Sequence, residues 1–223
     1  MISTSLRSSS RRPDLYWTSR AEGDLGPGAG RAADGRRRAV HAGAWAWLRQ
    51  VHGAAVRVVG APGAVQGDEG DALVTAVPGV ALAVFTADCA PVAMTSPEGV
   101  AGLVHAGWRG LDAGVVEAAA EAMRQLGATR IEAALGPCIR PECYEFGAAD
   151  LDRLAARWGP AVRGRTAAGR PALDLPAAVG AALEHSGAEL VLDAGSCTAC
   201  SEEWFSHRAR GDLGRQATLL VAA

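Results

Sequence analysis

The sequence predicts a single compact domain of the α/β class, in the α+β-like form with mixed β-sheets flanked by helices. Its 223 residues suit one large domain. From Trp45 onward, short apolar β-like runs alternate with Ala-rich helical patterns, and no internal repeat divides the chain. We expect residues 1–13, rich in Ser and Arg, to be a disordered extension, and residues 14–223 to form the one folded, catalytic domain.

Eight short runs of aliphatic and β-branched residues are predicted to be strands. Four of them lie too close together in the sequence for helical crossovers, so part of the sheet must be antiparallel. These four are 72–75, 80–86, 92–95 and 100–105, and the other four are 56–59, 131–135, 189–192 and 218–221.

Three segments show helical periodicity. In the first, Asp112 is expected to cap a helix that ends at Gly127. The second runs near 148–158, and the third starts after Asp174, with a proline in its first turn. The Gly- and Arg-rich stretch 21–38 is predicted to be the least regular part after the N-terminus.

Charge and composition exclude several classes of function. With a net charge of -2, the chain has no excess of positive charge of the kind that binds nucleic acid or an anionic membrane surface. All 22 residues of the Lys-plus-Arg count are Arg, which excludes lysine Schiff-base chemistry and a phosphate-loop lysine. The 5 cysteines are an odd number, expected to be free thiols in a reducing compartment. We therefore expect a cytoplasmic protein, a monomer or weak dimer, that binds neither nucleic acid nor membrane.

Two histidines and one cysteine stand where strands give way to tight turns. Cys89 follows the run 80–86, His105 ends another such run, and His52 precedes the strand 56–59. Strand ends beside Gly-rich turns present side chains to a cleft. Two imidazoles and one thiolate suit Zn²⁺ better than copper, and three protein ligands leave a fourth coordination position for water or substrate.

Several motifs occur in an order that resembles one bacterial family, from about Trp45 to the C-terminus. It is the laccase-domain family named polyphenol oxidases, also called peptidoglycan editing factors and now regarded as purine nucleoside phosphorylases. Its fold is a compact α/β domain related to a group of proteins described as cysteine hydrolases. The matching motifs include Gln50-Val51-His52-Gly53, Gly67-Asp68 to Asp71-Ala72-Leu73-Val74-Thr75, Thr86-Ala87-Asp88-Cys89-Ala90-Pro91-Val92, His105-Ala106-Gly107-Trp108-Arg109-Gly110-Leu111, Gly136-Pro137-Cys138, Cys143-Tyr144-Glu145 and Phe205-Ser206-His207-Arg208.

The resemblance implies zinc bound by His52, Cys89 and His105, which would also be the catalytic residues. It implies a phosphorylase that uses phosphate to convert adenosine, inosine or methylthioadenosine to the free base and the ribose 1-phosphate. An adenosine deaminase activity would accompany it. The expected partners are therefore small molecules, a purine nucleoside and phosphate.

Five residues are expected to bind substrate, namely Arg20, Asp88, Arg109, Ser206 and Arg208. The planar fork of Arg109 suits phosphate, although a surface role is almost as well supported. Asp88 is expected either to orient an imidazole that binds the metal or to stabilise the turn in which it lies. Arg20 stands in a shortened form of the family's N-terminal motif, and His207 replaces the tyrosine that the family usually has.

Three other functions stay open. A hydrolase of cell-wall precursors would use Cys89 as a nucleophile activated by His105. A copper-dependent polyphenol oxidase is less favoured, because four-copper centres need more imidazoles than the 5 histidines here. A non-catalytic zinc protein is also less favoured, because structural zinc is normally closed by four protein ligands.

The motif Cys197-Thr198-Ala199-Cys200 has the spacing of redox and zinc motifs. Nothing places it in a thioredoxin-like unit. A four-cysteine zinc site that includes Cys138 and Cys143 is therefore a disfavoured interpretation.

Overall fold

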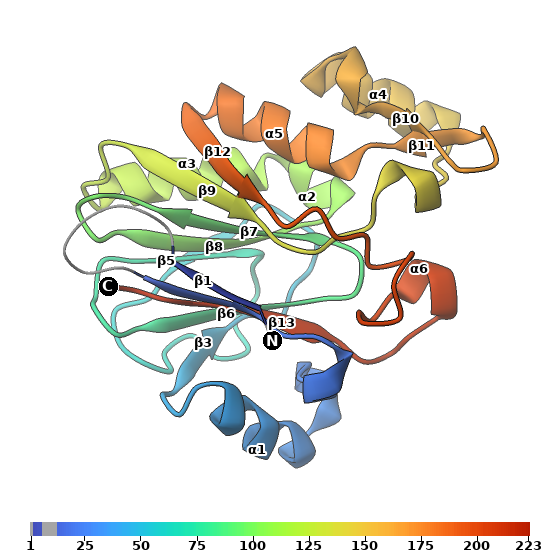
Figure 1. Cartoon of the computed structure of the whole chain (residues 1–223). Helices are drawn as coiled ribbons and strands as arrows, with labels where there is room; N and C mark the ends of the chain where they lie inside the picture. Colours follow the sequence, from blue (N-terminus) through green and yellow to red (C-terminus); the bar gives the residue numbers. More distant parts are fainter. Residues whose placement is uncertain (1, 6–12) are drawn as a thin grey trace.

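The computed structural model describes residues 2–5 and 13–223, in which two β-sheets lie face to face and helices cover their outer sides (Figure 1). The larger sheet contains β4 (Val56–Val58), β5 (Ala72–Thr75), β7 (Ala90–Thr95), β8 (Ala101–Ala106), β9 (Ile131–Leu135) and β12 (Ala188–Asp193). Its strand order is β12-β9-β7-β8-β5-β4. The β5–β8, β7–β8 and β7–β9 pairs are antiparallel, whereas β4–β5 and β9–β12 are parallel.

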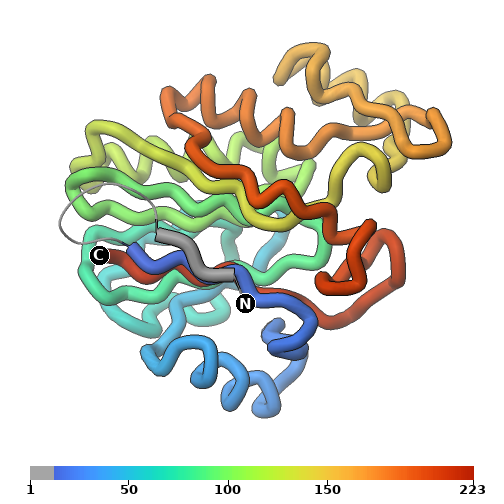
Figure 2. The backbone as a smooth tube through the Cα atoms, viewed as in Figure 1, coloured from blue at the N-terminus to red at the C-terminus, as the bar shows by residue number. Residues whose placement is uncertain are grey.

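The second sheet joins the two ends of the chain. It contains β1 (Ile2–Ser5), β2 (Asp14–Trp17), β3 (Trp45–Trp47), β6 (Ala81–Thr86) and β13 (Gln216–Val221), in the order β1-β2-β13-β6-β3. Figure 2 shows the C-terminal strand running beside the N-terminal strand β2, with which it pairs antiparallel. Only β3–β6 is a parallel pair among the described strands of this sheet.

Helices form the outer layers. Figure 1 shows α3, α4 and α5 on the outer side of the larger sheet and α1 on the outer side of the other sheet. The helices are α1 (Arg31–Val40), α2 (Trp108–Ala113), α3 (Val115–Gln125), α4 (Ala148–Trp158), α5 (Leu175–His185) and the one-turn α6 (His207–Arg210). Short 3-10 turns occur at η1 (Arg20–Glu22), η2 (Pro27–Ala29), η3 (Pro141–Cys143) and η4 (Pro160–Val162). A separate hairpin is formed by β10 (Arg163–Arg165) and β11 (Pro171–Leu173). No described helix has the length and apolar character that crossing a membrane requires.

Strand β6 shows how the sequence produces these layers. Leu82 and Val84 pack between the two sheets, whereas Ala81, Ala83 and Phe85 belong to the apolar cluster on the other face. Successive side chains of a strand point to opposite faces, so a strand covered on both sides reads as an unbroken apolar run. The predicted α/β domain with mixed sheets is confirmed, and each of the eight predicted strands has its counterpart.

The helix predictions are partly confirmed. The Asp174 side chain accepts a hydrogen bond from the Ala177 amide at 2.9 Å and caps α5, as expected. The predicted cap at Asp112 is wrong, because Asp112 lies inside α2. The break between α2 and α3 falls instead at Gly114, whose φ of 91° is left-handed.

Two segments are more regular than the sequence predicts. The stretch 21–38 contains most of α1, in which Ala33 is the one buried residue, so its sequence shows no apolar stripe. The guanidinium of Arg37 fixes this helix by donating twice to the Leu25 carbonyl oxygen. Within the expected extension 1–13, Ile2–Ser5 forms β1 through backbone pairing, and residues 1 and 6–12 lie outside the described part of the chain.

Candidate metal and substrate site

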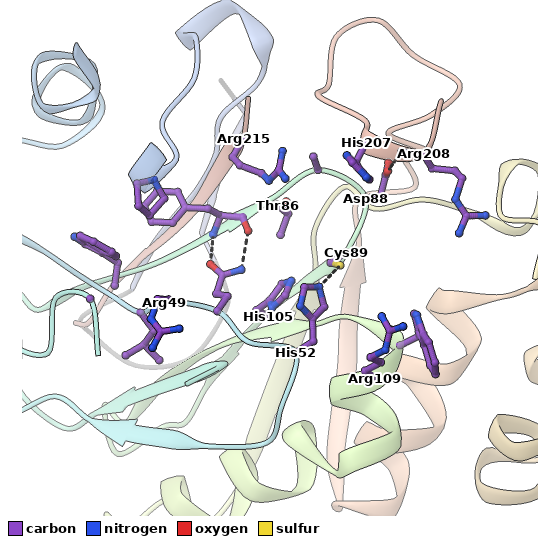
Figure 3. Close-up of a pocket in the computed structure, with 18 of the residues that line it drawn as sticks. Arg49, His52, Thr86, Asp88, Cys89, His105, Arg109, His207, Arg208 and Arg215 are labelled. Carbon is purple, nitrogen blue, oxygen red and sulfur yellow. Dashed lines mark hydrogen bonds between the residues drawn. The ribbon is translucent and has the colours of Figure 1, made fainter. Parts of the chain in front are cut away.

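His52, Cys89 and His105 meet at the edge of the larger sheet. His105 lies on β8, Cys89 lies in the turn from β6 to β7, and His52 lies in the loop that precedes β4. One donor atom from each residue lies within 4.8 Å of the other two. Figure 3 shows His52 and Cys89 pointing toward one another with His105 beside them. The structure thus brings together the three residues that the sequence indicates as metal ligands.

The spacing of these donors fits one tetrahedral zinc ion. Cys89 Sγ lies 3.8 Å from His52 Nε2, and the rings of His52 and His105 are 4.8 Å apart at 74°. A nitrogen and a sulfur bound to the same zinc lie about 3.6 Å apart. Gly107 leaves the room required, because a Cβ there would lie 2.9 Å from His52 and 3.1 Å from Cys89 Sγ.

Asp71 organises two of the three ligands, and sequence reasoning missed it. Its buried carboxylate accepts hydrogen bonds from the backbone amides of His52 at 2.9 Å and Gly53 at 2.7 Å. It also accepts from His105 Nδ1 at 2.9 Å, which leaves Nε2 of that ring free to bind a metal. The available signal was the motif from Gly67 to Thr75, in which Asp71 directly precedes a strand.

The three groups shift one another's protonation. Burial would raise the pKa of Cys89, but the imidazoles of His105 and His52 outweigh it and lower the pKa to about 6. Burial would lower the pKa of His105, but Cys89 and Asp71 raise it to about 9. Burial would likewise raise the pKa of Asp71, yet its hydrogen bonds from His105 and the backbone lower it. Without a metal, Cys89 and His105 therefore form a thiolate–imidazolium pair at neutral pH.

The donor atoms line a cavity of about 690 Å³. Four arginines reach it from separate elements: Arg49 from the loop after β3, Arg109 from α2, Arg208 from α6 and Arg215 from the segment before β13 (Figure 3). Aromatic side chains complete the walls, namely Trp47, Phe85, Trp108 and Tyr144. A cavity of this size with cationic and aromatic walls suits a small anionic or partly aromatic ligand.

Arg109 and Arg208, both expected to bind substrate, lie on the cavity wall. Arg109 is exposed, its Cζ lies 4.4 Å from the Trp108 ring centroid, and it forms no hydrogen bond or ion pair with another described residue. Arg208 lies 4.7 Å over the Tyr144 ring and donates to the Glu145 carbonyl oxygen at 2.7 Å. The guanidinium of Arg109 is therefore available to an anion.

Asp88 also lines the cavity, but it does not orient an imidazole. Its carboxylate accepts from the Thr198 hydroxyl at 2.7 Å and from the Arg208 backbone amide at 2.6 Å. Its own backbone has a left-handed φ of 101°. Of the two roles expected for Asp88, the structure places it in the turn, where it fixes the C-terminal loop at the rim of the cavity.

The structure does not place Arg20 and Ser206 on the cavity wall. Arg20 forms an ion pair with Asp212 at 2.5 Å and lies 4.5 Å over the Phe205 ring. Ser206 is fully buried and its hydroxyl accepts from the Ala209 amide at 3.1 Å. Arg20 contacts the loop that follows α6, and Ser206 caps the start of that helix, so a direct contact of either residue with substrate stays a prediction.

Gln50 is a further residue whose role the sequence did not indicate. Its amide donates to the Phe85 carbonyl oxygen and accepts from the Phe85 amide, each at 2.8 Å. Through this pair, the loop that carries His52 is attached to the strand that leads to Cys89. His207, which replaces the tyrosine of the family pattern, is exposed and lines the cavity.

Residues 31–223 match the model of the family described as multi-copper polyphenol oxidoreductase laccase. The chain belongs to this family. A laccase-family relative named purine nucleoside phosphorylase, from Streptomyces coelicolor, is 46% identical over 178 residues, which cover 77% of this chain and 72% of that protein. Another with that name, from Mycobacterium tuberculosis, is 43% identical over 177 residues, with coverage of 78% and 70%.

Solved structures share the laccase-family fold. YlmD of Geobacillus stearothermophilus superposes with a TM-score of 0.79 at 27% identity, covering 97% of this chain and 98% of that one. YfiH of Bacillus licheniformis has a TM-score of 0.84 at 22% identity, with coverage of 95% and 93%, and it supports the fold alone. The names of the curated relatives support an enzyme that acts on small molecules.

Proposed function

We propose that the chain is a zinc-dependent purine nucleoside phosphorylase with adenosine deaminase activity. The observation that carries the proposal is the position of the donors of His52, Cys89 and His105 in the same cavity as the unpaired guanidinium of Arg109. The relatives named purine nucleoside phosphorylase support the phosphorylase part of this proposal. Adenosine, inosine and methylthioadenosine are the proposed substrates, and the cytoplasm is the proposed location.

Phosphorolysis requires phosphate to be held beside the anomeric carbon of the ribose. A phosphate oxygen forms a bond to that carbon while the bond from carbon to the base nitrogen breaks, and the base leaves with the electron pair and takes up a proton. Because the chain has no lysine, arginine side chains are its cationic anchors for phosphate, and Arg109 and Arg208 are placed for this role. A zinc ion bound at the triad would supply Lewis-acid polarisation.

The walls of the cavity also suit the rest of a nucleoside. Phe85, Trp108 and Tyr144 provide apolar faces on which a purine ring can pack. The volume of about 690 Å³ lies within the range of ordinary small-molecule sites. Deamination replaces the amino group of adenosine with the oxygen of water and needs no anion, so it does not depend on Arg109.

A phosphate requirement tests the proposal. With metal-loaded protein, release of hypoxanthine from inosine should depend on inorganic phosphate and should produce ribose 1-phosphate in equal amount. Conversion of adenosine to inosine should continue without phosphate. Base release at the same rate with and without phosphate would contradict the phosphorylase assignment.

One observation favours a second candidate, a hydrolase with a cysteine nucleophile. The pKa of Cys89 is lowered to about 6 by its neighbouring imidazoles, as it is in thiol-dependent hydrolases. Zinc discriminates between the two functions, because a metal bound to Cys89 would block a nucleophilic thiolate. A phosphorylase should therefore be activated by zinc, and a cysteine hydrolase acting on cell-wall precursors should be inhibited by it.

A further inference from the structure

A second group of metal-binding side chains lies outside the cavity. The Sγ atoms of Cys143, Cys197 and Cys200 all lie within 4.8 Å of one another. Cys143 and Cys200 are the nearest pair, at 3.1 Å, and Cys200 Sγ lies 3.6 Å from Oε1 of Glu142. Cys138, included in the disfavoured four-cysteine interpretation, is not part of this group. Three thiols therefore converge from two separate segments, and the carboxylate of Glu142 lies beside one of them, Cys200.

Backbone contacts hold the two segments in register. Cys197 pairs with Cys138 in a parallel bridge, and the Thr198 amide donates to the Cys138 carbonyl oxygen at 3.1 Å. Cys143 is the last residue of η3, which Pro141 begins.

Arg210 fixes the loop that carries Cys200. Its guanidinium donates to the carbonyl oxygens of Thr198 at 2.9 Å and Ala199 at 3.2 Å. These contacts fix the positions of the segments that carry the three sulfurs.

We propose that Cys143, Cys197, Cys200 and Glu142 bind a second metal ion, a thiophilic d¹⁰ cation such as zinc. Three thiolates suit such a cation, and a fourth protein ligand closes the coordination sphere as in structural zinc sites. Two sulfurs bound to one zinc lie about 3.8 Å apart. This distance lies between the 3.1 Å that separates Cys143 from Cys200 and the 4.8 Å within which all three sulfurs fall. Binding releases the protons of the three thiols to solvent.

A disulfide between Cys143 and Cys200 is the competing outcome. It would use two of the sulfurs and leave the buried Cys197 without a role, although this residue contributes to the same group. It would also require an external oxidant, whereas a cation engages all three sulfurs without one. The convergence of three sulfurs thus favours the metal site.

The position of this second site gives it a structural role. η3 leads directly to Tyr144, and the loop after Cys200 leads to His207 and Arg208, all of which line the cavity. A cation at the four ligands would join these two walls. It takes no part in the chemistry, because its coordination would be complete without substrate.

Metal stoichiometry tests the proposal on the full chain. Protein reduced with a phosphine, stripped of metal and titrated with zinc should bind two equivalents, measured by elemental analysis after removal of free metal. Cys200→Ser should bind one equivalent, and so should Cys89→Ser, which removes a ligand of the first site. Cys200 is exposed, so the variant should keep its fold. The matched control is Cys138→Ala, which should still bind two.

Cobalt reports the ligand type directly. The thiolate-to-cobalt absorption of wild type should fall by more than half in Cys200→Ser, and Glu142→Gln should weaken the second equivalent at least tenfold. The proposed cysteine site would be overturned if the wild-type protein bound one equivalent of zinc, and if this equivalent were lost in Cys89→Ser but kept in Cys200→Ser. A Cys143–Cys200 disulfide that forms in air even with zinc present would do the same. An unchanged affinity in Glu142→Gln would remove the carboxylate from the ligand set.

Discussion

The carboxylate of Asp71 accepts a hydrogen bond from His105 Nδ1 at 2.9 Å and at the same time holds the backbone amide of His52 at 2.9 Å. One fully buried acid thus sets the ring orientation of one ligand and the loop position of another. The backbone of His52 adopts a left-handed φ of 59° where these hydrogen bonds are made. Metal affinity should therefore depend on Asp71 almost as strongly as on the ligands.

Asp71→Asn should lower zinc affinity by about 10- to 100-fold, the usual effect of losing a partner behind a ligand histidine. The amide keeps the volume of the carboxylate, but it has one acceptor oxygen and no charge to offer to four donors, the amides of Val51, His52 and Gly53 and the ring of His105. Competition with a chromophoric chelator measures the change. Asp68→Asn is the control, because Asp68 is exposed in the same loop and should leave affinity unchanged. Equal affinity in both variants would contradict this role for Asp71.

His52→Ala and His105→Ala should each lose the zinc equivalent of the cavity site while remaining folded. The reason is that the two remaining donors hold a zinc ion weakly. Elemental analysis and circular dichroism together measure the outcome. His185→Ala is the matched control, because His185 is exposed at the end of α5 and contacts only Trp158 among the described aromatic rings. Full zinc retention in both ligand variants would rule out the site.

Cys89 in metal-free protein should be alkylated by iodoacetamide at pH 7, because a pKa of about 6 makes most of it thiolate. Since the folded-state pKa is lowered, the rate should hold above pH 6 and fall as the pH drops below it. Zinc should protect Cys89 by occupying the sulfur. Peptide mapping measures the modification, and Cys138, which is buried and whose pKa burial raises, should stay unmodified in every sample. Zinc-independent alkylation would show that Cys89 is not a ligand.

Arg109→Ala should raise the KM for phosphate at least tenfold and change the nucleoside KM much less. Arg109 is the arginine of the cavity wall that has no hydrogen-bond or ion-pair partner among the described residues. Its guanidinium, which lies over the Trp108 ring, is therefore free to bind an anion. Arg153→Ala is the control: Arg153 also lies over the Trp108 ring, at 5.6 Å, but outside the cavity. Steady-state kinetics with each substrate varied separates the two effects. A similar rise in the KM for phosphate in both variants would mean that the effect comes from lost packing on the Trp108 ring and not from lost phosphate binding.

Much of the fold could be predicted because its signals are local, such as the unbroken apolar run of β6. The turns that carry Cys89 and His105 are also visible in the sequence, whereas the grouping of these residues with the distant His52 was implied by the family motifs. Asp71 could not be assigned, because its partners His105 and Gly53 are distant in sequence and a lone acid before a strand has many uses. The helix α1 was missed because it buries only Ala33 and depends on Arg37 reaching the Leu25 carbonyl oxygen.

The cysteine group was considered from the sequence, with Cys138 included, and was disfavoured for a related reason. Cys197 and Cys200 form a recognisable motif, but their partner is Cys143. This residue precedes β12 in the sequence, whereas the motif follows it, and the fold brings the two segments together. Arg20 and Ser206 were expected in the cavity because they lie in family motifs. The structure instead shows Arg20 in an ion pair with Asp212 and Ser206 as the cap of the helix that carries Arg208, two contacts that sequence position alone does not reveal.

Asp88→Asn should reduce kcat/KM for phosphorolysis at least tenfold and leave zinc stoichiometry unchanged. The Asp88 carboxylate accepts from the Thr198 hydroxyl and from the Arg208 amide, whereas an asparagine would place an NH₂ group against one of these donors. Leaving such a buried donor unpaired costs about 1–3 kcal/mol, enough to release the C-terminal loop from the cavity rim. Thr198→Val removes only one of the two hydrogen bonds and should have a smaller effect. Zinc loss in Asp88→Asn would instead mean that Asp88 acts on the metal ligands, which its contacts do not support.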